Sequence, residues 1–306
     1  MRRCWLIAVL ATICATASFA GCGENDDEAT GADVVATTTQ VGDIARQVAG
    51  ERASVRQILE PNSDPHEYEP RPSDAKAVMD ADVVVRSGGD LDDWLSDLLD
   101  NTGGDARTLT LIGAMRTRRA GDEVDPHWWQ DPRNGVTAVR KIRDALIAAD
   151  PVGRDAYTSN ADAYLKRLRA LDGAIRACID AIPARERKLV TDHDALGYYA
   201  DRYAVQVVGT VIPALSTQAQ ASAGEVARLA RTIRREGVKT VFAESSVNHK
   251  LANAIARDSG AKVGGDLYAD TLGAEGSAGE TYLGSLKANT QALVEGFTGG
   301  QERCAF

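Results

Sequence analysis

The chain has 306 residues, of which 44% are hydrophobic and 26% are charged, an ordinary composition for a globular protein with one large or two smaller domains. Its formal net charge is −9, and it becomes 33 − 44 = −11 without residues 1–21, which contain Arg2 and Arg3 but no acidic residue. This acidity, with no basic stripe, argues against nucleic acid as a partner and suits a cationic ligand.

Residues 1–21 have the layout of a secretory signal peptide: two arginines, an apolar run from Trp5 to Ala20, and small residues before Cys22. The run is too short to be expected to span a bilayer. Residues 19–22, Phe-Ala-Gly-Cys, resemble a bacterial lipobox, which predicts that Cys22 is lipidated and anchors the protein to a membrane. The alternative is an ordinary signal peptide cleaved nearby, and in either case the protein is exported.

The segment that follows is acidic and rich in small residues, so we expect residues 22–33 to form a flexible tether. From residue 34 onward, β-branched apolar runs alternate with amphipathic stretches. Strands are expected at residues 34–39, 54–59, 82–88 and 107–110. Helices are expected at residues 42–50, 73–81, 91–101 and 134–150. This alternation predicts a parallel sheet with helices on both faces.

A long stretch of helical spacing, residues 152–182, separates this region from a second alternating one. Strands are expected there at residues 188–192, 204–211, 240–244 and 261–268. Helices are expected at residues 195–203, 222–237, 246–260 and 280–297. We therefore predict an α/β fold with two lobes, each a mainly parallel sheet flanked by helices. The lobes, at residues 34–150 and 184–306, would be joined by one long rigid helix within residues 151–183.

Five cysteines are present, but Cys4 and Cys14 would leave with the signal peptide and Cys22 would carry the lipid. Only Cys178 and Cys304 remain in the mature fold. They could form one disulfide in an oxidising compartment, but sequence gives no distance between them, so the question stays open. No CxxC motif occurs, which argues against a thiolate metal site.

Three of the four histidines occupy similar places on the predicted scaffold. His66 and His127 each follow Asp-Pro, and His193 directly follows the strand at residues 188–192. Ligands of open α/β sheets collect at the carboxyl ends of strands, and neutral imidazole is a good donor to zinc and other transition metals. Asp270, in a loop after the last predicted strand, would supply a fourth donor. The metal would lie between the lobes.

Each of these histidines, taken alone, is more often a surface or helix-capping residue than a ligand. We interpret His249 as a surface residue. Five further residues near the site have alternative interpretations. Glu244 could support a ligand but is interpreted as a helix-capping acid. Trp128 and Trp129 could cover the site or belong to the core. Glu67 and Glu69 are expected in solvent.

Four segments together resemble the ligand segments of the zinc- and manganese-binding solute-binding lipoproteins of bacterial ABC importers, known as the cluster A-I metal-binding family. In order and spacing they are NSDPHEYEPRPSD (62–74), DPHWWQDPRN (125–134), TDHDALGYYADRY (191–203) and GGDLYADTLG (264–273). The resemblance covers essentially the whole mature chain.

This resemblance implies an extracytoplasmic, non-enzymatic protein that binds its metal in a cleft between two lobes. It would deliver the metal to a membrane permease driven by an ATPase. The implied ligands are His66, His127, His193 and Asp270. Manganese-preferring members often have Glu at the third position, so His193 favours zinc, with manganese as the alternative. The His-rich loop of many zinc members is absent. We expect a monomer, with metal affinity falling as the histidines protonate below about pH 6.5.

Two functions of other classes compete with transport. A zinc hydrolase would also use three histidines, but it needs an open coordination position, and no HExxH motif occurs. A surface adhesin on the same fold would bind a host protein without needing the four ligands.

Overall fold

The computed structural model describes residues 31–102 and 105–306. The predicted signal peptide, Cys22 and most of the predicted tether lie outside the described residues. No helix in the described ranges is both long and apolar enough to cross a membrane. The described residues before helix α5 (Arg154–Asp180) form the N-terminal half, and those after it form the C-terminal half.

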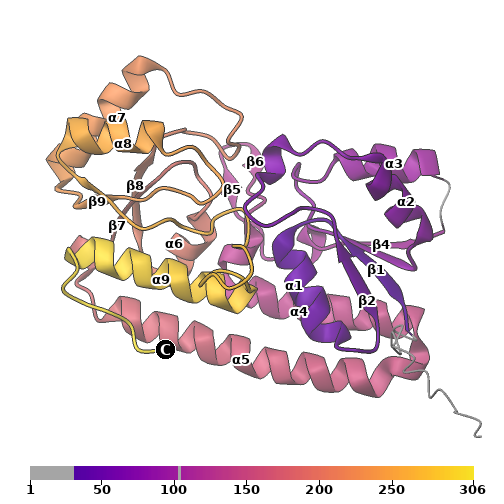
Figure 1. Ribbon diagram of the computed structural model, residues 1–306. Helices are drawn as coiled ribbons and strands as arrows, with labels where there is room; N and C mark the ends of the chain where they lie inside the picture. Colours follow the sequence, from indigo (N-terminus) through magenta and orange to yellow (C-terminus); the bar gives the residue numbers. More distant parts are fainter. Residues whose placement is uncertain (1–30, 103–104) are drawn as a thin grey trace, which may run out of the picture.

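The N-terminal half is built on a four-stranded parallel sheet with the order β2-β1-β3-β4 (Figure 1). Its strands are β1 (Asp33–Ala36), β2 (Ser54–Gln57), β3 (Val83–Arg86) and β4 (Arg107–Thr110), and its helices are α1 (Thr39–Ala49), α2 (Pro72–Asp80), α3 (Trp94–Thr102) and α4 (Pro132–Ala149).

Alternation along the strands explains why helices cover both faces of this sheet. Val34 and Val83 point into a core that includes residues of α1, α4 and α5. Val35 and Val84 point the other way, into a core that includes residues of α2 and α3. Successive strand residues face opposite sides, so a run of valines buries both faces at once.

The C-terminal half contains two short parallel pairs. The first pair is β7 (Lys188–Thr191) with β8 (Gln206–Thr210), and the second is β9 (Thr240–Val241) with β10 (Lys262–Val263). The amide of Phe242 donates to the carbonyl of Val190 at 2.9 Å, so the two pairs lie side by side. The helices are α6 (Gly197–Tyr203), α7 (Ala223–Glu236), α8 (Lys250–Ser259) and α9 (Tyr282–Thr298).

Helix α5 (Arg154–Asp180) runs beneath both halves (Figure 1). It has 27 residues and is therefore about 40 Å long at 1.5 Å per residue. Its buried side, which includes Tyr164 and Ile175, joins one apolar core extending from Val34 to Phe297. Because both halves and the helix share this core, the packing resists large motion of one half relative to the other.

The predicted α/β fold class is confirmed. The strands expected at 240–244 and 261–268 are much shorter than predicted, because their chains leave the ladder after two residues and pair again only at the isolated bridge between Glu244 and Leu267. Residues 119–124 form a small hairpin that was not predicted, β5 (Arg119–Ala120) with β6 (Glu123–Val124). Its turn contains Gly121 at φ 60°, a left-handed conformation that glycine adopts without steric cost.

The open question about the cysteines is resolved by a disulfide. Cys178 in α5 and Cys304 after α9 are bonded, with their Cα atoms 5.6 Å apart. The bond fastens the C-terminal tail to the long helix.

Candidate metal centre

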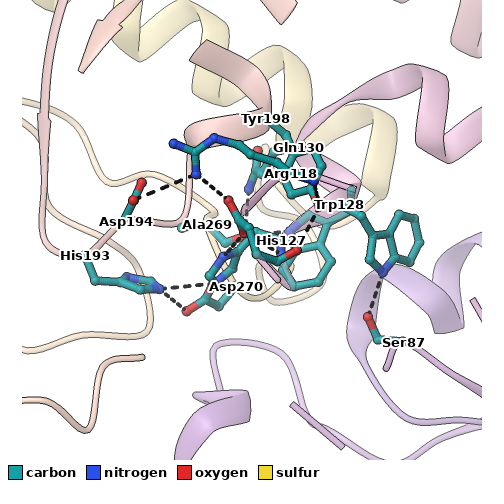
Figure 2. A network of polar contacts seen from close by, with 12 residues as sticks. Ser87, Arg118, His127, Trp128, Gln130, His193, Asp194, Tyr198, Ala269 and Asp270 are labelled. Carbon is teal, nitrogen blue, oxygen red and sulfur yellow. Dashed lines mark hydrogen bonds and ion pairs between the residues drawn. The ribbon is translucent and has the colours of Figure 1, made fainter. Parts of the chain in front are cut away.

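Four predicted side chains converge at the seam between the halves. His66 lies in a 3-10 turn (Pro65–Glu67) after β2, His127 immediately precedes another (Trp128–Gln130), His193 follows β7, and Asp270 follows β10. One donor atom from each lies within 4.8 Å of all the others. Figure 2 shows His127, His193 and Asp270 pointing toward one another.

The distances suit a single small cation. The Nε2 atoms of His127 and His193 are 3.4 Å apart, and they lie 3.2 and 3.1 Å from the carboxylate oxygens of Asp270. His66 Nε2 is 3.6 Å from Asp270 Oδ2. Donors roughly 2.0–2.1 Å from a zinc ion at tetrahedral angles stand about 3.3 Å apart.

The group is almost closed to solvent. The side chains of His127, His193 and Asp270 have no exposed surface, whereas that of His66 retains 7%. A buried carboxylate is costly unless it is paired, and the two Asp270 oxygens face imidazole nitrogens at 3.2 and 3.1 Å. His66 is therefore the most exposed of the four converging side chains.

Carboxylates orient two of the imidazoles from behind. Asp125 Oδ1 lies 2.8 Å from His127 Nδ1, and Glu244 Oε2 lies 2.8 Å from His193 Nδ1. A proton on each Nδ1 leaves the lone pair on Nε2, which faces the shared centre. The interpretation of Glu244 as a helix-capping acid was wrong: it is fully buried, and Oε1 also accepts from the His193 amide at 3.0 Å.

The loop carrying His66 is held by the C-terminal half. Asp64 Oδ1 accepts from the His66 amide at 2.9 Å, and Asp64 Oδ2 accepts from the Thr217 hydroxyl at 2.7 Å. The side-chain amide of Gln218 donates to the carbonyl of His66. Pro65 begins the turn and fixes its φ, which reduces the entropy cost of presenting the imidazole.

Conversely, the loop carrying Asp270 is held by the N-terminal half. The carbonyl of Ala269 accepts from Trp129 Nε1 at 2.8 Å and from Gln130 Nε2 at 2.7 Å. The amide of Leu272 donates to the Thr39 hydroxyl at 2.9 Å. The loop that carries Asp270 therefore belongs to the C-terminal half by sequence and is hydrogen-bonded to the N-terminal half through Ala269 and Leu272.

The charges within the group are strongly coupled. Burial lowers the pKa of His127, but Asp270 and Asp125 outweigh it and raise that pKa to about 9. Burial raises the pKa of Asp270, but His193 and His127 outweigh it and hold that pKa well below the usual range. Burial lowers the pKa of His66 to about 4. The carboxylate thus requires positive charge beside it, which a metal ion or bound protons supply.

The remaining residues considered from sequence lie around the site. His249 is outside the group, with its Nε2 3.1 Å from the carbonyl of Glu244. Trp129 is buried against His127, with ring centroids 5.5 Å apart, and Trp128 donates to Ser87 at 2.9 Å (Figure 2). Glu67 and Glu69 are exposed, as predicted.

Comparison with known proteins places the chain in a family. The profile of the family described as zinc-uptake complex component A, periplasmic, matches residues 34–296. The chain belongs to this family, and the resemblance noted in its sequence is confirmed.

Several relatives are similar over nearly the whole chain. The manganese-binding lipoprotein MntA of Halalkalibacterium halodurans is 35% identical, covering 96% of this chain and 97% of that protein. The iron-binding protein YfeA of Yersinia pestis is 30% identical, covering 95% and 96%. The structure of the periplasmic zinc binding protein TroA from Treponema pallidum superposes with a TM-score of 0.81 at 26% identity, covering 87% and 99%.

Proposed function

We propose that this protein captures one zinc ion between its halves and delivers it to the permease of an ABC importer. As a member of its family, the chain is a metal-binding component of an ABC importer and not an enzyme. Its relatives include a metal ABC transporter substrate-binding lipoprotein of Lactococcus lactis. The observation that carries the proposal is the buried convergence of His66, His127, His193 and Asp270 from both halves.

The donor set supports zinc as the cargo. Three imidazole nitrogens and one carboxylate suit tetrahedral zinc, whereas manganese favours oxygen donors and a larger coordination number. Two of the imidazoles also have carboxylate partners, which raise their basicity toward a metal. A relative named for binding manganese makes manganese the alternative cargo.

The proposal includes how the protein is placed and organised. Lipidation at Cys22 would tether an exported protein to the outer side of the cytoplasmic membrane, beside its permease. The two lobes, residues 34–150 and 184–306, would hold the ion between them in a monomer, with residues 151–183 as the connecting helix. Mass spectrometry of the membrane-extracted protein tests the lipid, and sedimentation tests the monomer.

Competition between metals tests the cargo. Protein stripped with a chelator is titrated with zinc and with manganese against an indicator of known affinity, and bound metal is counted after gel filtration. We expect one zinc per chain, with manganese displaced by equimolar zinc. Asp270→Asn, which keeps the shape of the side chain but loses its charge, should bind zinc at least tenfold more weakly. Equal retention of the two metals would overturn the assignment of zinc.

A further inference from the structure

Arg118 lies directly behind the metal centre. Its guanidinium Nη1 is 2.8 Å from Asp125 Oδ2 and 3.8 Å from Asp194 Oδ2, and its Nε is 3.2 Å from Asp201 Oδ2. Asp125 belongs to the N-terminal half, whereas the other two carboxylates belong to the C-terminal half. Figure 2 shows the guanidinium reaching toward Asp194, with His127 on its other side. The positively charged guanidinium of Arg118 therefore joins the two halves at the back of the site.

Asp125 connects the Arg118 guanidinium to His127, one of the predicted ligands. Its Oδ1 accepts from the His127 amide at 3.0 Å and lies 2.8 Å from His127 Nδ1, while its Oδ2 contacts Arg118. The side chains of Asp125 and His127 have no exposed surface, and that of Arg118 has 24%. With both oxygens held from opposite sides, the carboxylate cannot rotate away from the imidazole.

Helix α6 is shaped to receive the guanidinium. A Cβ on Gly197, the first residue of α6, would lie 2.2 Å from Arg118 Nη1, so only glycine allows this approach. The Tyr198 hydroxyl accepts from the Arg118 amide at 2.9 Å and donates to the carbonyl of Asp125 at 2.8 Å. Backbone and side chain of Arg118 are thus both docked on the same short helix.

We propose that Arg118 is a positioning residue of the metal centre: by holding Asp125 against α6, it fixes the orientation of His127 and locks the halves together behind the ion. This inference rests on the proposed function, because it concerns how that site is built. Arginine suits the task because its planar guanidinium presents several donors in fixed directions to carboxylates.

The test uses the full mature chain, with Co²⁺ as a spectroscopic probe and zinc for affinity. Arg118→Met removes the charge but keeps a long side chain, and it should weaken zinc binding about 10- to 100-fold. It should also shift the visible absorption of bound Co²⁺, which reports ligand geometry and is not moved by a general loss of stability. Arg119→Met, at an exposed position of the same hairpin, is the matched control and should bind like wild type.

A second variant reaches the same contact from the other side. Gly197→Ala would displace the guanidinium sterically, so it should reproduce the affinity and spectral changes of Arg118→Met. In the double variant the two effects should not add, because both remove one interaction. Gly197→Ala also keeps the test decisive if Arg118→Met does not fold.

Three outcomes would overturn the inference. In the first, Arg118→Met binds zinc as tightly as Arg119→Met and leaves the Co²⁺ spectrum unchanged. In the second, the Arg118→Met and Gly197→Ala effects are simply additive. In the third, wild-type protein itself binds neither metal, which would overturn the proposed function as well; the first two outcomes leave the proposed function standing.

Discussion

Thr217 donates a hydrogen bond to Asp64 across the seam between the halves, with an O···O distance of 2.7 Å. Asp64 in turn accepts from the amide of His66, the most exposed of the four converging residues. A loop of the C-terminal half thus holds the loop of the N-terminal half that carries His66, a predicted ligand. The N-terminal half holds the Asp270 loop in the same way, so each half restrains a predicted ligand of the other.

Thr217→Val should therefore speed up metal release. Valine has nearly the same shape but cannot donate to Asp64, and loss of a hydrogen bond to a charged group costs about 1.5–3 kcal/mol. We expect the release rate to rise at least roughly tenfold over that of wild type, with most of the change in dissociation rather than association. Stopped-flow mixing of the zinc-loaded protein with excess chelator measures it.

Thr117→Val is the matched control for this measurement, since Thr117 is exposed and lies outside the loops that carry the four ligands. Its release rate should equal that of wild type. If Thr217→Val releases zinc no faster than the control, the His66 loop does not limit release.

Glu244→Gln should weaken zinc binding about 10- to 100-fold. The glutamine can still accept from the His193 amide through Oε1, but its NH₂ group would face His193 Nδ1 in place of Oε2. The imidazole would then move its proton to Nε2 and lose the lone pair that faces the metal. Equilibrium competition with a zinc indicator measures the loss.

Glu244→Asp is the companion variant because it keeps the charge while shortening the side chain. It should retain more affinity than Glu244→Gln. The reverse order would mean that the size of this side chain, and not its proton-accepting oxygen, matters to His193.

Much of the fold and of the site could be predicted from the sequence. Strand and helix periodicity is a local property, so the parallel sheets and α5 were visible without coordinates. Two sequence features indicated the four converging residues: the shared Asp-Pro before His66 and His127, and the place of His193 and Asp270 after predicted parallel strands, whose carboxyl ends meet at one edge. His66, His127, His193 and Asp270 were accordingly placed in loops that the structure brings together.

The residues that support this group could not be predicted in the same way. Glu244 follows β9 just as Asp270 follows β10. Only the packing shows that Glu244 contacts Nδ1 of His193, whereas Asp270 contacts its Nε2. Arg118 comes from a segment without periodicity, and its contacts to Asp125 and Asp194 depend on how two halves dock. Such contacts are long-range and leave no pattern in the sequence.

The affinity for metal should begin to fall at a higher pH than the value of about 6.5 expected from the sequence. Asp270 and Asp125 raise the pKa of His127 to about 9, so in metal-free protein at neutral pH this imidazole carries a proton that a metal must displace. Apparent zinc affinity should fall about tenfold per pH unit from pH 9 downward for that proton alone. Calorimetry at pH 7.5 in buffers of different ionisation enthalpy counts the protons, and release of none would contradict the prediction.

The same pKa predicts the stability of the metal-free protein. His127 has a raised pKa in the folded state, so its contribution is fully present below the unfolded value of 6.5 and is lost as pH rises through about 9. The melting temperature of metal-free protein should therefore decrease between pH 6.5 and 9. Zinc-loaded protein should not show this decrease, because the metal replaces the proton as the neighbour of Asp270.

Removal of the Cys178–Cys304 disulfide should reduce stability without affecting metal binding. The bond closes a loop across a sequence separation of 126, and such a constraint on the unfolded chain is worth about 3 kcal/mol. The double variant Cys178→Ser, Cys304→Ser should melt roughly 6–12 °C lower than wild type. Its zinc affinity should match wild type, because the tail packs on α5 away from the four predicted ligands. Reductant should lower the melting temperature of wild type but not of the variant, and an equal effect on both would mean that the bond does not stabilise the fold.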